Sequence, residues 1–204
     1  MKIKRLIGGF IGTCTYFVIN EVTKECIVID PHEDIKPISD YLTKEGLTPK
    51  AVLITHGHFD HIGGVSFLKS LGAKVYMSKA DAWQIDNPEQ MAASLGVKIE
   101  HFDVDQFIKE PDLLEICGFK IKVLDTPGHT KGGLCFVLDE YIFTGDTIFR
   151  ESYGRTDFVD SDFASLKSSI LKILSLDGEY TLLPGHGYET YLSYEKMYNP
   201  IMQD

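Results

Sequence analysis

Short apolar runs alternate with helical patterns along most of the chain. Runs of β-branched and aromatic residues bounded by turn residues predict strands. Apolar residues spaced three or four apart, in two cases ending at a glycine, predict helices. The expected strands are 16–19, 26–29, 51–55, 75–77, 119–123, 134–138, 141–144 and 180–183, and the expected helices are 35–45, 65–71, 81–95, 163–173 and 191–198. The helix over 81–95 is expected to break at Pro88.

The order of these elements indicates the fold class. Strands come first, then a strand and helix unit, then more strands, and finally helices around one last strand. This order predicts an α/β fold with two sheets covered by helices, rather than one doubly wound sheet. Because no long Pro/Gly/Ser linker interrupts the chain, residues 1–204 are expected to form one domain.

The N-terminus resembles a signal peptide only in part. Residues 1–5 are basic and residues 6–19 are mostly apolar, which is typical of such a leader, but no A-x-A-like cleavage site follows. Gly8, Gly9 and Gly12 fit a turn between two strands, and the apolar stretch is too short to cross a membrane as a helix. We therefore expect this segment to belong to the mature fold of a cytoplasmic protein.

Composition narrows the class of partner. The chain has 204 residues, of which 44% are hydrophobic and 25% charged, and its formal net charge is −10. A nucleic-acid-binding protein normally carries the opposite charge, so nucleic acid and anionic membranes are not expected as partners, and a small-molecule substrate is. Four cysteines stand among apolar neighbours without a CxxC pair, which favours buried, reduced thiols. The sequence does not indicate an oligomeric state.

A dense group of polar residues follows the expected strand 51–55. The segment His56-Gly57-His58-Phe59-Asp60-His61 places four potential metal ligands within six residues. In a loop, His56 and His58 can point the same way because they are two residues apart, while Asp60 and His61 can face a second point nearby. A regular helix could not direct all four to one place. Imidazole and carboxylate together suit divalent ions such as Zn²⁺.

Three further segments place a polar residue beside glycine at the end of an apolar strand. They are Asp125-Thr126-Pro127-Gly128-His129-Thr130, Phe143-Thr144-Gly145-Asp146-Thr147 and Leu183-Pro184-Gly185-His186-Gly187. Each alone is typical of a structural turn, but together they favour one site. The candidate metal ligands are His56, His58, Asp60, His61, His129, Asp146 and His186, which include five of the seven histidines in the chain.

These motifs, in this order, resemble the metallo-β-lactamase superfamily. The similarity rests on Thr55 to Gly64, on Thr126 to Thr130, on Gly145-Asp146 and on Pro184 to Gly187, and it spans most of the chain. It implies an αββα sandwich with a dinuclear metal site at one edge. By this resemblance His56, His58 and His129 hold one metal; Asp60, His61 and His186 hold the other; and Asp146 bridges the two.

Within the superfamily the chain looks most like the short, single-domain glyoxalase II group of thioester hydrolases. The similar segments are Gly145 to Phe149 with Gly154 to Phe158, and Pro184 to Gly187 followed by Glu195 and Asn199-Pro200. Two departures concern glutathione. Eighteen residues, 187–204, follow His186, which leaves no room for the helical domain that binds glutathione in long glyoxalase II enzymes. His32 stands where the family commonly has glycine.

The implied cofactors are two divalent metal ions, taken as zinc with iron or manganese as alternatives. Two such ions about 3.5–4 Å apart can hold a bridging water as hydroxide near neutral pH. Asp60 is the candidate catalytic residue, because it can orient this nucleophile as ligand and acceptor. The expected reaction is hydrolysis of a thioester, such as S-lactoylglutathione or an analogue built on another thiol, and no G-x-S-x-G nucleophile motif is present.

Basic and aromatic residues near the motifs are candidates for substrate binding. They are Lys131, Arg150, Tyr153 and Arg155, each with surface or structural pairing as the alternative. Alternatively, Arg155 pairs with Asp157 and holds the loop behind the metals in place. His32 is expected in an exposed loop, and His101 has no assigned role.

Other interpretations of the same motifs are less favoured than a thioester hydrolase or are left open by the motifs. A mononuclear iron persulfide dioxygenase has an Arg-Thr-Asp-Phe segment similar to 155–158 and would use His56, His129 and Asp146. Retention of every second-metal residue favours the hydrolase. A lactonase or other ester hydrolase would use the same site. A non-catalytic metal scaffold is disfavoured by the complete ligand set, and a nuclease would need added basic surface.

Overall fold

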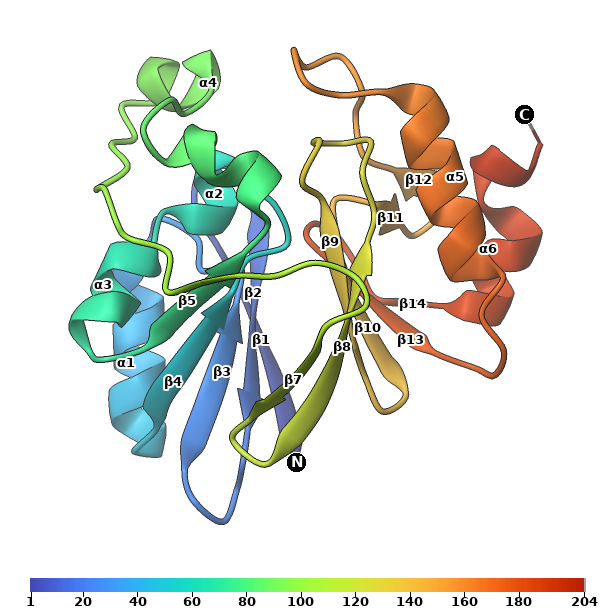
Figure 1. Ribbon diagram of the computed structural model, residues 1–204. Helices are drawn as coiled ribbons and strands as arrows, with labels where there is room; N and C mark the ends of the chain where they lie inside the picture. Colours follow the sequence, from blue (N-terminus) through green and yellow to red (C-terminus); the bar gives the residue numbers. More distant parts are fainter. Residues whose placement is uncertain (204) are drawn as a thin grey trace.

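The structure, a computed structural model that describes residues 1–203, has two six-stranded sheets packed face to face with helices on both outer sides (Figure 1). The first sheet has the order β1 (Lys2–Gly8), β2 (Thr13–Ile19), β3 (Glu25–Ile29), β4 (Thr48–Leu53), β5 (Lys74–Met77) and β6 (Gln106–Phe107). The second has the order β14 (Thr190–Tyr191), β13 (Thr181–Pro184), β10 (Tyr141–Gly145), β9 (Leu134–Leu138), β8 (Phe119–Asp125) and β7 (Leu113–Ile116). A small hairpin pairs β11 (Ile148–Phe149) with β12 (Ser152–Tyr153).

Helices cover the outer face of each sheet, as Figure 1 shows. The α-helices are α1 (Ile35–Glu45), α2 (Phe59–Ile62), α3 (Val65–Ser70), α4 (Gln90–Ser94), α5 (Phe163–Leu174) and α6 (Leu192–Tyr198), and the 3₁₀ helices are η1 (Lys79–Ile85) and η2 (Pro200–Met202). Both sheets are mixed, since β3 pairs with β4 and β10 with β13 in parallel while most other pairs are antiparallel. The predicted fold class, two mixed sheets flanked by helices, is confirmed.

The two faces of β2 show why this layering buries the strand completely. Tyr16 and Val18 point into the core between the sheets, whereas Phe17 and Ile19 belong to the core under the helices of the first sheet. Phe17 meets Tyr41 of α1 edge to face, with ring centroids 5.0 Å apart. Because successive side chains of a strand point to opposite faces, a strand covered on both sides reads as a continuous apolar run.

The carboxyl ends of several strands meet at one edge of the sandwich. Strands β8 and β10 are both antiparallel to β9, and β13 is parallel to β10, so all three end at the same edge. The amide of Leu134 donates to the carbonyl of Thr55 at 2.8 Å, which joins the end of β4 to this edge. Every segment that the sequence marked as ligand-bearing therefore begins there.

The break expected at Pro88 is confirmed: η1 ends at Ile85 and α4 starts at Gln90, and Pro88 in the segment between them lacks a backbone donor. The first part differs from the expected α-helix in being a 3₁₀ helix. The turn expected at Gly8 to Gly12 is confirmed, and Gly9 and Gly12 take positive φ values of 73° and 76°. The four cysteines are free, and three of them are buried. Within residues 1–203, no helix is long and apolar enough to cross a membrane.

Candidate metal centre

The structure brings all seven candidate ligands together at this edge. They fall into three overlapping groups whose ligand atoms lie within 4.8 Å of one another. The groups are His56, His58 and His129; His56, His61 and Asp146; and Asp60, His61 and His186. The loop after β4 supplies four of the seven residues, and the loops after β8, β10 and β13 supply one each.

In the first group, three imidazoles direct nitrogen atoms toward one point. Nδ1 of His58 lies 3.1 Å from Nε2 of His56 and 2.9 Å from Nε2 of His129. The other nitrogen of His129 donates to the carbonyl of Arg155 at 2.8 Å. The other nitrogen of His56 lies 3.0 Å from the hydroxyl of Thr55, which itself donates to Asp30. The converging nitrogens are therefore the ones that carry lone pairs.

The second group lies beside the first and is built around Asp60. Its Oδ2 atom is 3.1 Å from Nε2 of His61 and 3.3 Å from Nε2 of His186. The hydroxyl of Thr13 also donates to this oxygen at 2.5 Å, which fixes the carboxylate. Nδ1 of His61 donates to Asp30 at 3.0 Å, so Nε2 is the nitrogen that faces the group and that would offer a lone pair once the ring is deprotonated.

Asp146 lies between the two groups. Its Oδ2 is 3.5 Å from Nε2 of His129 and 3.5 Å from Nε2 of His186, while Oδ1 is 3.5 Å from Nε2 of His61. Oδ1 is buried and has no hydrogen-bond partner among the described residues. A buried carboxylate oxygen without a donor is costly unless a cation satisfies it. This atom, with the converging lone pairs, shows that the site fits divalent metal ions.

Burial controls the protonation of the imidazoles. It lowers the pKa of His56 and of His58 well below the ordinary value, and the neighbouring imidazoles add to the effect. Burial also opposes charging of His61, but the carboxylates of Asp60, Asp146 and Asp30 together raise the pKa of that ring well above its ordinary value. A ligating imidazole must be unprotonated, so metal binding at this second group releases a proton from His61.

Two buried aspartates that the sequence did not single out as site residues hold the loops in place. Asp30 accepts from the amide and the hydroxyl of Thr55, at 2.8 and 2.6 Å, as well as from His61. Asp81 accepts from the amide of Gly57 at 3.0 Å, the hydroxyl of Thr130 at 2.7 Å and the amide of Gly132 at 2.6 Å. Asp81 therefore links the loop of His56 and His58 to the loop of His129.

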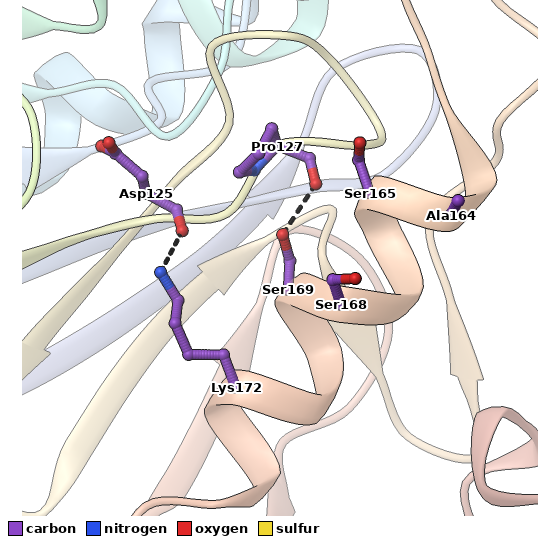
Figure 2. Close-up of a pocket in the computed structure, with 7 residues that line it drawn as sticks. All are labelled: Asp125, Pro127, Ala164, Ser165, Ser168, Ser169 and Lys172. Atoms are coloured by element: carbon purple, nitrogen blue, oxygen red, sulfur yellow. Dashed lines mark hydrogen bonds between the residues drawn. The ribbon is translucent and has the colours of Figure 1, made fainter.

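Helix α5 fixes the loop of His129 from the other side. Figure 2 shows Ser169 donating to the carbonyl of Pro127 at 2.7 Å and Lys172 to the carbonyl of Asp125 at 2.5 Å. At Gly128, whose φ is 142°, a Cβ would lie 2.2 Å from the backbone nitrogen of Leu166, so only glycine lets the loop approach α5 this closely. The hollow in Figure 2, of about 510 Å³, has no histidine in its lining and is separate from the ligand groups.

The residues predicted to contact substrate are spread more widely. Arg155 lines the cavity over the histidines, which has a volume of about 150 Å³. Arg150 lies over the ring of Tyr194 at 5.4 Å, and Tyr153 packs against Phe163. Lys131 is exposed, and none of these last three residues lines that cavity. Their role in substrate binding stays a prediction.

The expectation of an exposed loop for His32 is wrong. The residue is fully buried, because its backbone amide donates to Thr15 at 3.0 Å and draws the loop under the end of β1. Its ring occupies the space left by Gly8, where a Cβ would lie 2.4 Å from the imidazole. His101, in contrast, is exposed and pairs with Asp86 at 2.7 Å, away from the site.

Glu89 is a further residue that the sequence did not reveal. Its carboxylate lies 3.2 Å from Nε2 of His58 and accepts from the amide of Phe59 at 3.2 Å. Burial raises the pKa of Glu89 to about 7. Position 89 lies within the segment expected to be helical and belongs to no metal-ligand motif, so the sequence carried no signal for this contact.

Comparison with known proteins gives consistent results. A sequence model described as the metallo-beta-lactamase superfamily matches residues 8–186. A curated relative, the hydroxyacylglutathione hydrolase GloC of Haemophilus influenzae, is 34% identical, and the match covers 88% of each chain.

Two solved structures match nearly the whole chain. The B3 metallo-beta-lactamase BLEG-1 superposes with a TM-score of 0.92 at 31% identity, covering 100% of both chains. TTHA1623, solved in a di-iron-bound form, gives a TM-score of 0.86 at 32% identity, covering 97% of this chain and 98% of the other.

Proposed function

The chain belongs to the metallo-beta-lactamase superfamily of metal-dependent hydrolases, and we propose that it hydrolyses thioesters at two divalent metal ions held by the seven clustered residues. The proposal rests on one observation above all: Asp146 lies 3.5 Å from His129 of one ligand group and 3.5 Å from His61 and His186 of the other, and its buried Oδ1 has no hydrogen-bond partner among the described residues. His56, His58 and His129 would hold one ion, and Asp60, His61 and His186 the other.

The metal could be zinc or iron. Imidazole and carboxylate ligands suit both, and TTHA1623, which is similar over most of its length, was solved with two iron ions. When bound, two such ions supply Lewis acidity and lower the pKa of a coordinated water.

The residues of this chain orient the reaction. Asp60 lines the cavity over the histidines and can accept a proton from the attacking water, while Thr13 keeps its carboxylate in one orientation. Phe158 packs against the rings of His58 and His129, with centroids 4.7 and 5.5 Å away, and excludes water from that side. A thiolate is a good leaving group, so the site needs no separate general acid to expel it.

The thioester assignment is supported by the GloC relative and by the resemblance of 145–149 and 154–158 to short glyoxalase II enzymes. It is tested by assaying the purified protein with thioesters, lactones and a persulfide, beside elemental metal analysis. We expect about two metal ions per chain, thioester hydrolysis, and loss of that activity in His58→Ala and Asp60→Ala. One iron per chain with oxygen uptake on a persulfide would replace the proposal with a dioxygenase.

A further inference from the structure

A second groove adjoins the cavity over the histidines. It has a volume of about 440 Å³, within the range of about 300–1,000 Å³ that is typical of small-molecule sites. It lies between η1, the start of α4 and residues 157–160, and it shares His58, Glu89, Met91 and Phe158 with the histidine cavity. A molecule whose reacting group lies over the histidines can therefore extend into this groove.

The walls of the groove carry large apolar side chains that are open to solvent. Trp83 is 48% exposed and Met91 39% exposed, although large apolar side chains of these types are usually buried. Pro88, Phe158 and Val159 complete the apolar lining. Exposed apolar side chains that gather around one hollow indicate a surface for an apolar ligand.

The charges around the groove disfavour an anionic ligand. Arg155 is the one arginine, and no lysine is found, among the described residues that line either cavity, and Asp157 holds its guanidinium through two hydrogen bonds of 2.9 and 2.7 Å. The groove itself is lined by the carboxylates of Glu89, Asp157 and Asp160. An acidic group would meet uncompensated negative charge here, whereas a hydrocarbon chain can pack against the apolar side chains of the groove.

We propose that this groove binds the acyl chain of the substrate and that the chain is apolar and several carbons long. The proposal rests on the proposed hydrolase function, which places the acyl carbonyl over the histidines. Each methylene buried in the groove is expected to raise affinity by up to about fourfold, so a long apolar acyl group is favoured over a short hydroxylated one.

The first test is a binding experiment that does not depend on turnover. Trp83 is the single tryptophan of the chain, so its fluorescence reports on the groove directly. The metal-loaded protein is titrated with butyrate, hexanoate, octanoate and lactate, the carboxylates that hydrolysis would release. We expect a saturable change in emission and an affinity that rises with chain length, with lactate weakest. Absence of a fluorescence change, or equal affinity for all four, would overturn the proposal.

The second test uses Met91→Ala with Met197→Ala as the matched control, since Met197 is exposed on α6 and lines neither cavity. Acetyl and hexanoyl thioesters of N-acetylcysteamine are compared by kcat/KM. We expect wild type and Met197→Ala to prefer the hexanoyl ester equally, and Met91→Ala to reduce that preference roughly threefold or more. Hydrolysis with no chain-length preference would overturn the acyl-binding role of the groove but leave the hydrolase function in place. Carboxylate affinity that rises with chain length, without any hydrolysis, would support the groove and overturn the hydrolase function.

Discussion

The carboxylate of Glu89 lies 3.2 Å from Nε2 of His58, on the opposite edge of the ring from the Nδ1 atom that faces His56 and His129. Carboxylates in this position fix the tautomer and the orientation of a ligating imidazole. Glu89 comes from the segment between η1 and α4, far in sequence from any ligand loop. The first ligand group therefore depends on a residue that also lines the proposed acyl groove.

Replacing Glu89 should weaken metal binding at the first group without unfolding the protein. We expect Glu89→Ala to lower the affinity of one of the two sites about 10–100-fold, which is usual for removal of such a partner. Glu89→Gln keeps an oxygen that can accept from Nε2 and should lose less. Affinity is measured by competition with a coloured chelator, and Glu115→Gln, an exposed change, serves as control. Equal metal affinity in all four proteins would show that Glu89 does not position His58.

Asp81 should matter for stability, because it is fully buried and accepts three hydrogen bonds that join two ligand loops. In Asp81→Asn an NH₂ group replaces one acceptor oxygen and faces a donor. We expect a loss of about 2–3 kcal/mol in the free energy of unfolding, measured by urea denaturation. Asp86→Asn, an exposed change one residue beyond η1, should cost less than about 0.5 kcal/mol. Comparable losses in the two variants would contradict this assignment.

The ligand set could be predicted from the sequence because each member follows an apolar strand directly. Parallel strands end at the same edge of a sheet, so the loops after 141–144 and 180–183 meet, whereas the strand over 51–55 belongs to the other sheet and its loop joins them through the packing of the two sheets. The fold class followed from the order of strands and helices for the same reason. Both inferences depend on local patterns that survive in a single sequence.

The supporting contacts could not be predicted, since they depend on how distant segments pack. Asp81 lies in a segment predicted to be helical, and nothing local indicates that its side chain turns toward Gly57 and Thr130. His32 is expected in an exposed loop, yet its ring fills the space that Gly8 leaves. The two-residue strands β6, β11, β12 and β14 are too short to show any period.

Gly185 is expected to be irreplaceable for steric reasons. A Cβ at this position would lie 2.2 Å from Oδ1 of Asp146 and 2.7 Å from Cε1 of His61. We expect Gly185→Ala to displace Asp146, to reduce the metal content and to lower activity at least about 100-fold. The control is Gly72→Ala, where φ is 93° and a Cβ meets nothing within 4 Å. Gly72→Ala places alanine at a positive φ without any steric contact, so its free energy of unfolding should fall by about 1 kcal/mol while its metal content stays complete. A fully metallated Gly185→Ala protein would contradict the prediction.

Removal of the metal ions should destabilise the fold, because the ions would bind the seven residues only when the loops are assembled. At a free metal concentration of 100 times Kd, each site stabilises the folded state by about 2.7 kcal/mol, which for a chain of this length raises Tm by roughly 5–10 °C. Chelated protein should therefore melt roughly 10–20 °C lower than metal-loaded protein, and zinc or iron should restore the difference whereas magnesium should not. Asp146→Asn should shrink the difference, since Asp146 lies between both groups, while the exposed change Asp177→Asn should leave it intact. Identical melting temperatures of chelated and metal-loaded wild-type protein would contradict the prediction, because they would show that the seven clustered residues do not bind metal ions in the folded state.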